Sequence, residues 1–258
     1  MSAVCLGERR PDMNIYACSD IHGQYHLFKE MLNDIRFSDD DFLYILGDII
    51  DRGPESIPML QDIMQRDNVI CILGNHEFMM YTQYRIPERE SPWLLSANGG
   101  AVTRAAFEKL SALEQKQILD YIENMALQIY LPIEGTEYLL SHSDFVEGRN
   151  SLLFRGSYFN TVFDTVWNSP WRMWENVSKR KYKKDGRIHV IGHVPVQRID
   201  ENPVLSNAFI DPDYNIIDID LGCASIGFRG HAVGHGLCCM NLTKYARGEG
   251  KNSFTYYF

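Results

Sequence analysis

The sequence predicts an α/β fold built on a parallel sheet, and two observations carry that prediction. Short apolar runs at 14–19, 42–46 and 69–73 alternate with two segments, 23–37 and 55–66, whose apolar residues recur at helical spacing. A polar motif containing glycine follows each apolar run. Because β-α-β-α-β alternation implies right-handed crossovers between parallel strands, the loops after the three strands should meet at one edge of the sheet.

The rest of the chain is predicted to add helical cover and further strands. A helix is expected at 113–125, because Ser111 and Glu114 have the spacing of a capping box. Strand patterns resume at 138–141, 188–191, 216–219 and 237–242. No internal repeat or domain linker is evident, so we predict a single domain over 14–258, preceded by a flexible arm at 1–13.

Composition narrows the class of protein. The chain has 258 residues, of which 45% are hydrophobic, and this length and content support a sizeable core. A net charge of -9 argues against broad binding to nucleic acid or to anionic membranes. No apolar run approaches the ~20 residues that span a bilayer, and the N-terminus lacks a signal-peptide core. Six cysteines without a C-x-x-C pair are typical of reduced thiols, so we expect a cytoplasmic protein.

Four short motifs follow one another along the chain. They are S-D-I-H-G at 19–23, G-D-I-I-D-R-G at 47–53, G-N-H-E at 74–77 and G-H at 192–193. A lone Asp or Asn before a helix is more often an N-cap than a ligand. Here, however, Asp, His and Asn, which suit hard or borderline divalent cations, follow successive strands. The pattern predicts a two-metal centre that hydrolyses phosphoesters.

The metal ligands can be assigned by position. A carboxylate that bridges two divalent ions ~3.5–4 Å apart is expected in such a centre, and Asp48 is our candidate. Asp20 and His22 lie two residues apart at a strand end, so both can reach the first metal together with Asp48. The second metal would be held by Asp48, Asn75, His142 and His193.

Three residues of the motifs remain for the chemistry itself. His76 adjoins a predicted ligand and suits a general acid that protonates the departing oxygen, with Asp51 orienting its imidazole. Arg52 can present two parallel donors to phosphate oxygens. The predicted nucleophile is a hydroxide that bridges the two metals.

These residues resemble the phosphoprotein phosphatases of the metallophosphoesterase superfamily, which share the order G-D-x-H-G, G-D-x-x-D-R-G, G-N-H-E, H and G-H. The similarity extends from about residue 14 to 242. W-L-L at 93–95 and N-G-G at 98–100 are similar to the compact bacterial and phage branch, as is the I-D-x-G-like stretch at 219–222. The resemblance implies a calcineurin-like four-layer αββα sandwich with helical cover. It also implies two metals, commonly Mn²⁺ with iron or zinc as alternatives, and hydrolysis without a phosphoenzyme.

The chain departs from the family pattern at several positions. Ser19 replaces the first glycine of the first motif, and Ser143-Asp144 stands where many relatives have glycines. The family's second phosphate-binding arginine lies between the two late histidines, where Arg172 is our candidate and Arg155 the reserve. The loop at 226–236 is longer than in phage relatives, and we expect it to line the substrate entrance.

We therefore predict a phosphomonoesterase that hydrolyses phosphoserine and phosphothreonine in a phosphoprotein or phosphopeptide, with phosphotyrosine as a further candidate substrate. Arg52, Arg172 and Asn75 are predicted to contact the substrate. One alternative is a symmetrical diadenosine tetraphosphate hydrolase, and a second is a non-catalytic phosphate-binding protein. Cys223 and Arg229 have the C-x5-R spacing of cysteine-dependent phosphatases, but the surrounding residues do not match that class.

Overall fold

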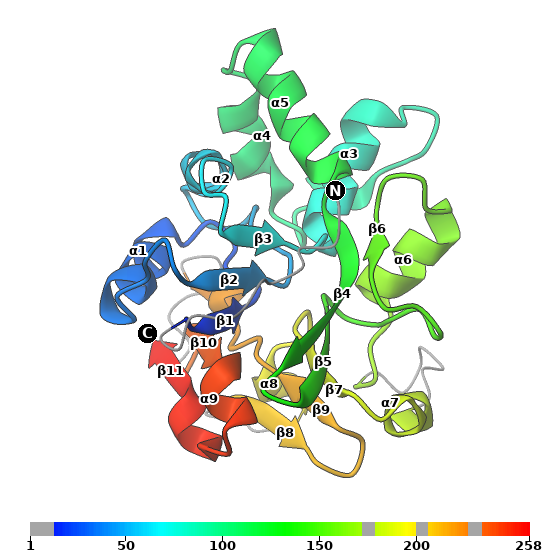
Figure 1. Ribbon diagram of the computed structural model, residues 1–258. Helices are drawn as coiled ribbons and strands as arrows, with labels where there is room; N and C mark the ends of the chain where they lie inside the picture. The colour runs from blue at the N-terminus through cyan, green and yellow to red at the C-terminus, as the bar shows by residue number, and fades with distance from the viewer. Residues whose placement is uncertain (1–12, 172–178, 200–205, 227–233) are drawn as a thin grey trace.

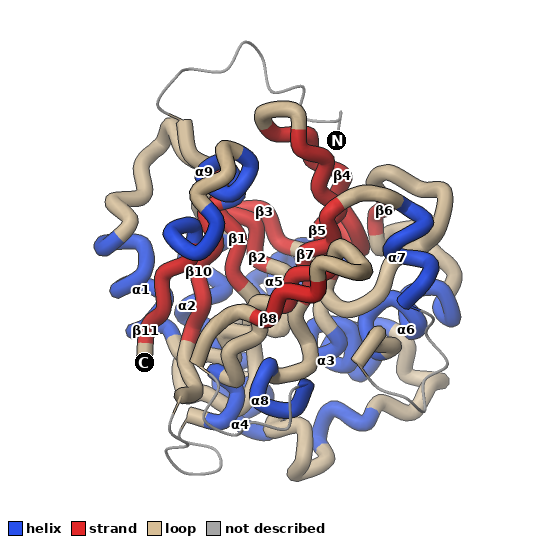
Figure 2. Tube along the Cα trace, turned by 90° about the horizontal axis from the view of Figure 1, so that it is seen from below, coloured by secondary structure: helices blue, strands red, loops and turns tan. Residues whose placement is uncertain are grey.

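A computed structural model describes residues 13–171, 179–199, 206–226 and 234–258 of the chain (Figure 1). Its centre consists of two β-sheets packed face to face, and helices cover the outer face of each sheet (Figure 1, Figure 2). The predicted α/β fold with a four-layer αββα arrangement is therefore confirmed. The predicted arm at 1–13 falls almost wholly outside the described residues, and the single domain stays a prediction.

The first sheet contains the parallel strands that the sequence predicts. In spatial order its strands are β11 (Phe254–Tyr257), β10 (Leu237–Asn241), β1 (Ile15–Cys18), β2 (Phe42–Ile45) and β3 (Val69–Cys71). β1, β2 and β3 run parallel, while β10 and β11 are antiparallel to their neighbours. The loops that leave β1, β2 and β3 therefore lie at one edge of this sheet.

The second sheet contains a parallel group of its own. In spatial order its strands are β6 (Leu152–Leu153), β4 (Ala126–Ile133), β5 (Thr136–Ser141), β7 (Ile188–Ile191), β9 (Ile216–Asp218) and β8 (Phe209–Asp211). β5, β7 and β9 are parallel, so the segments after them also share an edge. β4 was not predicted, and it forms a long antiparallel hairpin with β5.

The helices connect and cover these strands. They are α1 (Tyr25–Asp34), α2 (Ser56–Ile63), α3 (Asn75–Arg85), α4 (Gly100–Phe107), α5 (Ala112–Glu123), α6 (Phe159–Trp167), α7 (Lys179–Asp185), α8 (Val196–Ile199) and α9 (Leu242–Ala246), with short 3-10 turns at Pro92–Leu94, Cys223–Ser225 and Gly250–Ser253. The predicted capping box at α5 is present, because the Ser111 hydroxyl accepts from the Glu114 N–H. Among the described residues, no helix has both the length and the apolar character needed to cross a membrane.

One buried cluster lies between the two sheets, and a larger one lies between the first sheet and the helices that cover it. Ile15 and Ala17 of β1 face the second sheet, where they belong to the same buried cluster as Leu140. Tyr16 and Cys18 alternate with them and face the opposite side, toward the helical layer. This period of two shows that β1 is buried on both faces, which explains why its sequence is an unbroken apolar run.

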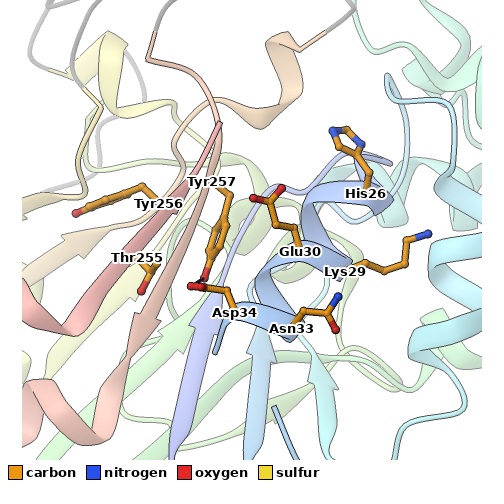
Figure 3. A pocket seen from close by; sticks show the side chains of 8 residues that line it. All are labelled: His26, Lys29, Glu30, Asn33, Asp34, Thr255, Tyr256 and Tyr257. Atoms are coloured by element: carbon orange, nitrogen blue, oxygen red, sulfur yellow. Dashed lines mark hydrogen bonds between the residues drawn. The ribbon is translucent and has the colours of Figure 1, made fainter. Parts of the chain in front are cut away.

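A shallow groove lies on the outside of the first sheet, where α1 runs beside the edge strand β11 (Figure 3). It is lined by His26, Lys29, Glu30, Asn33, Asp34, Thr255, Tyr256 and Tyr257. The Tyr257 hydroxyl donates to Asp34 Oδ2 at 2.9 Å and ties the strand to the helix. No residue of the predicted active site lines this groove, so the groove is separate from the site described next.

Candidate metal centre

The loops at the carboxyl ends of five parallel strands supply the predicted site residues. Asp20 and His22 follow β1, Asp48, Asp51 and Arg52 follow β2, Asn75 and His76 begin α3 after β3, His142 follows β5 and His193 follows β7. All of these except Arg52 and His193 are buried. The two sheets thus contribute to one polar cluster, which the contacts below define.

Asp48 lies at the centre of this cluster. Its Oδ2 is 3.5 Å from His22 Nε2 and 3.8 Å from His76 Nε2, while its Oδ1 is 3.6 Å from His142 Nε2. Two groups of side chains have ligand atoms within 4.8 Å of one another: His22, Asp48 and His76, and Asp48, His142 and His193. Asp48 alone belongs to both groups, which is the position that a bridging carboxylate requires.

Backbone carbonyls orient two of the histidine rings. His22 Nδ1 is 3.0 Å from the carbonyl oxygen of Ile50, and His142 Nδ1 is 2.7 Å from that of Leu46. Because a carbonyl only accepts, each Nδ1 carries the proton, and each Nε2 is left with a lone pair that can bind a cation beside the shared carboxylate. Burial lowers the pKa of His22 well below its usual range and so favours the neutral, metal-binding form.

Asn75 joins the two histidines from the second sheet. Its Oδ1 lies 3.1 Å from His142 Nε2 and 3.0 Å from His193 Nδ1. An amide oxygen between two imidazoles is a suitable third donor for a divalent ion. Burial opposes the charge of Asp48, but the surrounding histidines outweigh it and hold the pKa of Asp48 below its usual range.

Asp20 is placed differently from the predicted grouping. The described ligand groups contain His76 where the sequence predicts Asp20, and the Asp20 carboxylate instead accepts hydrogen bonds from the Ser19 hydroxyl and, at 3.0 Å, from the His193 N–H. Burial, followed by the charge of Asp220, raises the pKa of Asp20. Asp20 therefore links the end of β1 to the end of β7, and its role as a metal ligand stays a prediction.

The predicted acid and its carboxylate partner are in direct contact. His76 Nδ1 lies 2.7 Å from Asp51 Oδ2, and Arg52 Nη2 lies 3.4 Å from His76 Nε2. Burial opposes the charged imidazolium, but Asp48 and Asp51 outweigh it and raise the pKa of His76. His76 thus has one nitrogen held by a carboxylate while the other faces the arginine predicted to bind phosphate.

Glu77 is a functional residue whose task the motif alone did not reveal. Its Oε2 accepts from the backbone N–H groups of Asp48 at 2.9 Å and Gly74 at 3.0 Å, and its Oε1 accepts from those of Ile49 at 2.8 Å and Ile50 at 3.2 Å. Burial raises the pKa of Glu77 to about 7, whereas these four donors favour the carboxylate. Since each oxygen already accepts two N–H groups, the geometry requires the charged form. Glu77 therefore fixes the backbone that presents Asp48.

Strained backbone is concentrated at the site. Among the described residues, nine outside glycine have positive φ angles, and three of them, Arg36, Glu134 and Asn215, lie elsewhere. The other six belong to the site and have values between 47° and 74°: Asp20, His22, Asp48, Asp51, Arg52 and His193. Such a conformation costs non-glycine residues roughly 1–2 kcal/mol each and persists only where surrounding contacts enforce it. The turns at the strand ends therefore direct these side chains into the cluster, and their backbone conformation lowers local stability.

Other predicted features are placed as follows. Arg172 lies outside the described residues, as does most of the loop at 226–236. Arg155, the reserve candidate, is 66% exposed and lies 3.9 Å from Glu123 Oε1 in a surface ion pair.

Cys223 is buried, and burial raises the pKa of its thiol well above the usual range, which disfavours the thiolate that a cysteine mechanism needs.

The family model of the calcineurin-like phosphoesterases matches residues 13–234, and the chain belongs to this family. The match covers all of the candidate metal-site residues described above. The chain is therefore a metallophosphoesterase by family, as the motifs predict, and this family uses a binuclear divalent metal site.

The individual relatives are named for two different activities. A symmetrical bis(5'-nucleosyl)-tetraphosphatase from Nitrosospira multiformis is 31% identical over 136 residues, or 51% of this chain and 43% of the relative. Serine/threonine-protein phosphatase 2 from Escherichia coli is 29% identical over 136 residues, or 51% of this chain and 59% of the relative. The matched segments thus span about half of these relatives. A protein serine/threonine phosphatase from Saccharomyces cerevisiae shares the fold, with a TM-score of 0.61 and 13% identity over 97% of this chain and 80% of that one.

The residues present fit a binuclear centre. The two groups share one carboxylate, and even without His76 they supply imidazole nitrogen, carboxylate oxygen and amide oxygen, a donor set that suits borderline divalent ions. Gly74 also packs so closely on Asp48 that a side chain there would collide with the Asp48 carboxylate and N–H. Asp48 is thereby confined between a glycine and the histidines that would bind the same ions.

We expect Glu77→Gln to destabilise the protein by about 3 kcal/mol, because the amide NH₂ would face backbone N–H groups inside the core. The free energy of unfolding from urea titration measures this loss. The same substitution at exposed Glu108, on the surface at the end of α4, is the matched control and should change stability by less than about 0.5 kcal/mol. Equal stability of both variants would contradict the anchoring role of Glu77.

His142→Ala is expected to remove one of two bound divalent ions, because it deletes a ring from only the second ligand group. Metal content per chain, measured by plasma mass spectrometry after dialysis, tests this expectation. His26→Ala is the control, since His26 is exposed in the groove of Figure 3 and should leave both ions in place. Full metal content in His142→Ala would contradict the assignment.

Proposed function

We propose that this protein is a metal-dependent phosphomonoesterase that removes phosphate from phosphoserine and phosphothreonine in proteins, with phosphotyrosine as a further substrate. The observation that carries the proposal is the contact between the Asp51–His76 pair, Arg52 and the Asp48 cluster. A proton donor, a phosphate-binding cation and a candidate metal bridge are thus adjacent.

The protein side chains divide the hydrolysis between them. In this proposal Arg52 binds two phosphate oxygens and Asn75 contacts a third. Water attacks phosphorus as the bond to the serine oxygen breaks, and His76 Nε2 donates its proton to that departing oxygen. Asp51 holds the other nitrogen, so the imidazole keeps the orientation that this transfer needs.

Two divalent ions, when bound, would activate the attacking water and offset the negative charge of the phosphate. His22, Asp48, Asn75, His142 and His193 would hold them, with Asp20 as a further ligand. We propose Mn²⁺ for both positions, with iron or zinc as alternatives, as the resemblance to the bacterial and phage branch implies. The donor set of imidazole nitrogen with carboxylate and amide oxygen is compatible with each of these ions.

The substrate is the finer part of the proposal. Similarity to serine/threonine-protein phosphatase 2 from Escherichia coli supports a phosphoprotein or phosphopeptide, since it extends over 59% of that relative. The tetraphosphatase relatives support a second candidate, symmetrical hydrolysis of diadenosine tetraphosphate. The intact acid, carboxylate and ligand cluster argues against a third alternative, a non-catalytic phosphate-binding protein.

We also propose that the protein acts in the cytoplasm, without stable binding to nucleic acid or membranes. Cys18, Cys71, Cys223, Cys238 and Cys239 are buried free thiols, which is the state that a reducing compartment maintains. The net charge of -9 disfavours polyanionic partners outside the metal site.

Substrate preference separates the two candidates. We expect protein stripped with chelator to lose turnover, and refilling with Mn²⁺ to restore it with a phosphoserine peptide as the better substrate by kcat/KM. Diadenosine tetraphosphate, assayed in parallel on the same preparation, is the competitor. A higher kcat/KM for the dinucleotide would reject the phosphoprotein proposal while retaining the metal-dependent hydrolysis.

His76→Asn is expected to lower kcat for the phosphoserine peptide by about 10²–10⁴, the contribution of a general acid. Bound metal should stay at the wild-type level, because His76 is proposed to carry a proton and no ion. Plasma mass spectrometry and steady-state kinetics on one preparation give both values. Loss of one metal ion in this variant would instead make His76 a ligand.

A further inference from the structure

The carboxylate of Asp51 has a second partner besides the proposed acid. Its Oδ2 accepts from the indole Nε1 of Trp93 at 2.8 Å, and the same oxygen lies 2.7 Å from His76 Nδ1. Trp93 and Asp51 are both 0% exposed and His76 is 1% exposed. Two buried N–H donors therefore converge on one oxygen atom, at a chain separation of 42 residues for the indole.

Trp93 itself is firmly held. Its backbone N–H donates to the hydroxyl of Ser91, which donates in turn to the carbonyl of Met79 in α3. The ring of Tyr84 meets the indole edge to face, with centroids 5.8 Å apart. A side chain at Gly100 would lie 2.6 Å from the indole nitrogen, so glycine is required for α4 to begin this close to the ring.

The residues around Trp93 also contact the backbone of Asp51 and Arg52. We name residues 91–103 the cover segment. Its Thr103 hydroxyl accepts from the Asp51 N–H at 3.0 Å, and its Gly99 carbonyl accepts from the Arg52 N–H at 3.4 Å. Asp51 and Arg52 both have positive φ, at 74° and 67°, so external contacts are needed to hold them. The cover segment supplies several of these contacts.

A purely hydrophobic role does not account for the indole nitrogen. A phenylalanine would fill most of the same space, but it would leave Asp51 Oδ2 with a single donor. With two donors fixed in direction, the carboxylate cannot rotate about its own bond without breaking a buried hydrogen bond. The orientation of the carboxylate in turn sets the plane of the His76 ring.

The geometry points to Trp93 as a positioning residue for general acid catalysis. Its indole N–H holds the Asp51 carboxylate so that His76 Nε2 faces the departing oxygen of the substrate. The inference rests on the proposed function, because it takes His76 as the general acid. It adds that the cover segment is part of the catalytic apparatus, acting through Asp51.

Leaving-group dependence tests this inference. The alkoxide that departs from phosphoserine is strongly basic and needs a proton, whereas p-nitrophenolate is weakly basic and departs without one. We expect Trp93→Phe to lower kcat for a phosphoserine peptide about tenfold, with KM unchanged, and to leave kcat for p-nitrophenyl phosphate within about twofold of wild type. Trp167→Phe is the matched control, because Trp167 stacks on Phe163 and should affect neither substrate selectively.

The remaining outcomes contradict either the positioning role of Trp93 or the general-acid role of His76. An equal fall on both substrates, or no fall on either, would overturn the positioning role of Trp93. His76→Asn, assayed alongside, must show the same selectivity for the peptide more strongly. If it does not, the general acid assignment fails first, which distinguishes that failure from one confined to Trp93.

A spectroscopic measurement covers the case in which Trp93→Phe does not fold. In the ¹H–¹⁵N spectrum of the wild-type protein, an indole N–H bonded to a buried carboxylate should resonate downfield and exchange slowly with solvent. Asp51→Asn should shift one of the four tryptophan indole resonances upfield and speed its exchange. If no indole resonance responds to Asp51→Asn, the proposed contact is absent in solution and the inference is overturned.

Discussion

The buried carboxylate of Asp48, enclosed by histidine rings, is the interaction on which the rest of the site depends. An unpaired charge in this position would be very costly, so its neighbours must be cationic or must hold cations. Three rings approach it within 3.8 Å, and each ring comes from a different strand end. Glu77 fixes the backbone on the other side of this carboxylate through four N–H groups. The Glu77 carboxylate thus holds the backbone of the loop after β2, and the histidine rings enclose the Asp48 side chain that this loop presents.

The same constraint connects the two sheets. Asp48 and Asn75 follow strands of the first sheet, while His142 and His193 follow strands of the second, so the packing between the sheets sets the spacing of the candidate ligands. A side chain at Gly47 would lie within 2.8 Å of both Gly74 and His142 Nδ1, which shows how closely the strand ends approach one another. A substitution in the core between the sheets would therefore affect metal binding as well as stability.

Local motifs made most of the site predictable, and long-range contacts account for what was missed. The alternation of strand and helix over the first eighty residues correctly predicted the parallel strands, and with them the convergence of Asp48 and Asn75. Asp20 was grouped with His22 on the basis of spacing, and this role as a ligand stays a prediction; the hydrogen bond that its carboxylate accepts from the N–H of His193, 173 residues away, was not foreseen. No periodicity encodes a contact of that kind. β4 was missed because its eight residues directly follow a helix pattern and contain Pro132, which weakens a strand signal.

The surroundings of the proposed general acid, His76, are also relevant to which phosphoester the site hydrolyses. A general acid contributes most where the departing oxygen is strongly basic, as in a serine alkoxide, and least where a phosphate oxygen departs from a polyphosphate chain. In this chain several buried contacts surround the proposed acid: His76 Nδ1 and Trp93 Nε1 both lie against Asp51 Oδ2, and the cover segment contacts the backbone of Asp51 and Arg52. Several buried hydrogen bonds and positive φ angles thus fix the position of the proposed proton donor. In the proposed mechanism this support matters most for a phosphomonoester with a poor leaving group, which is the substrate class that we propose.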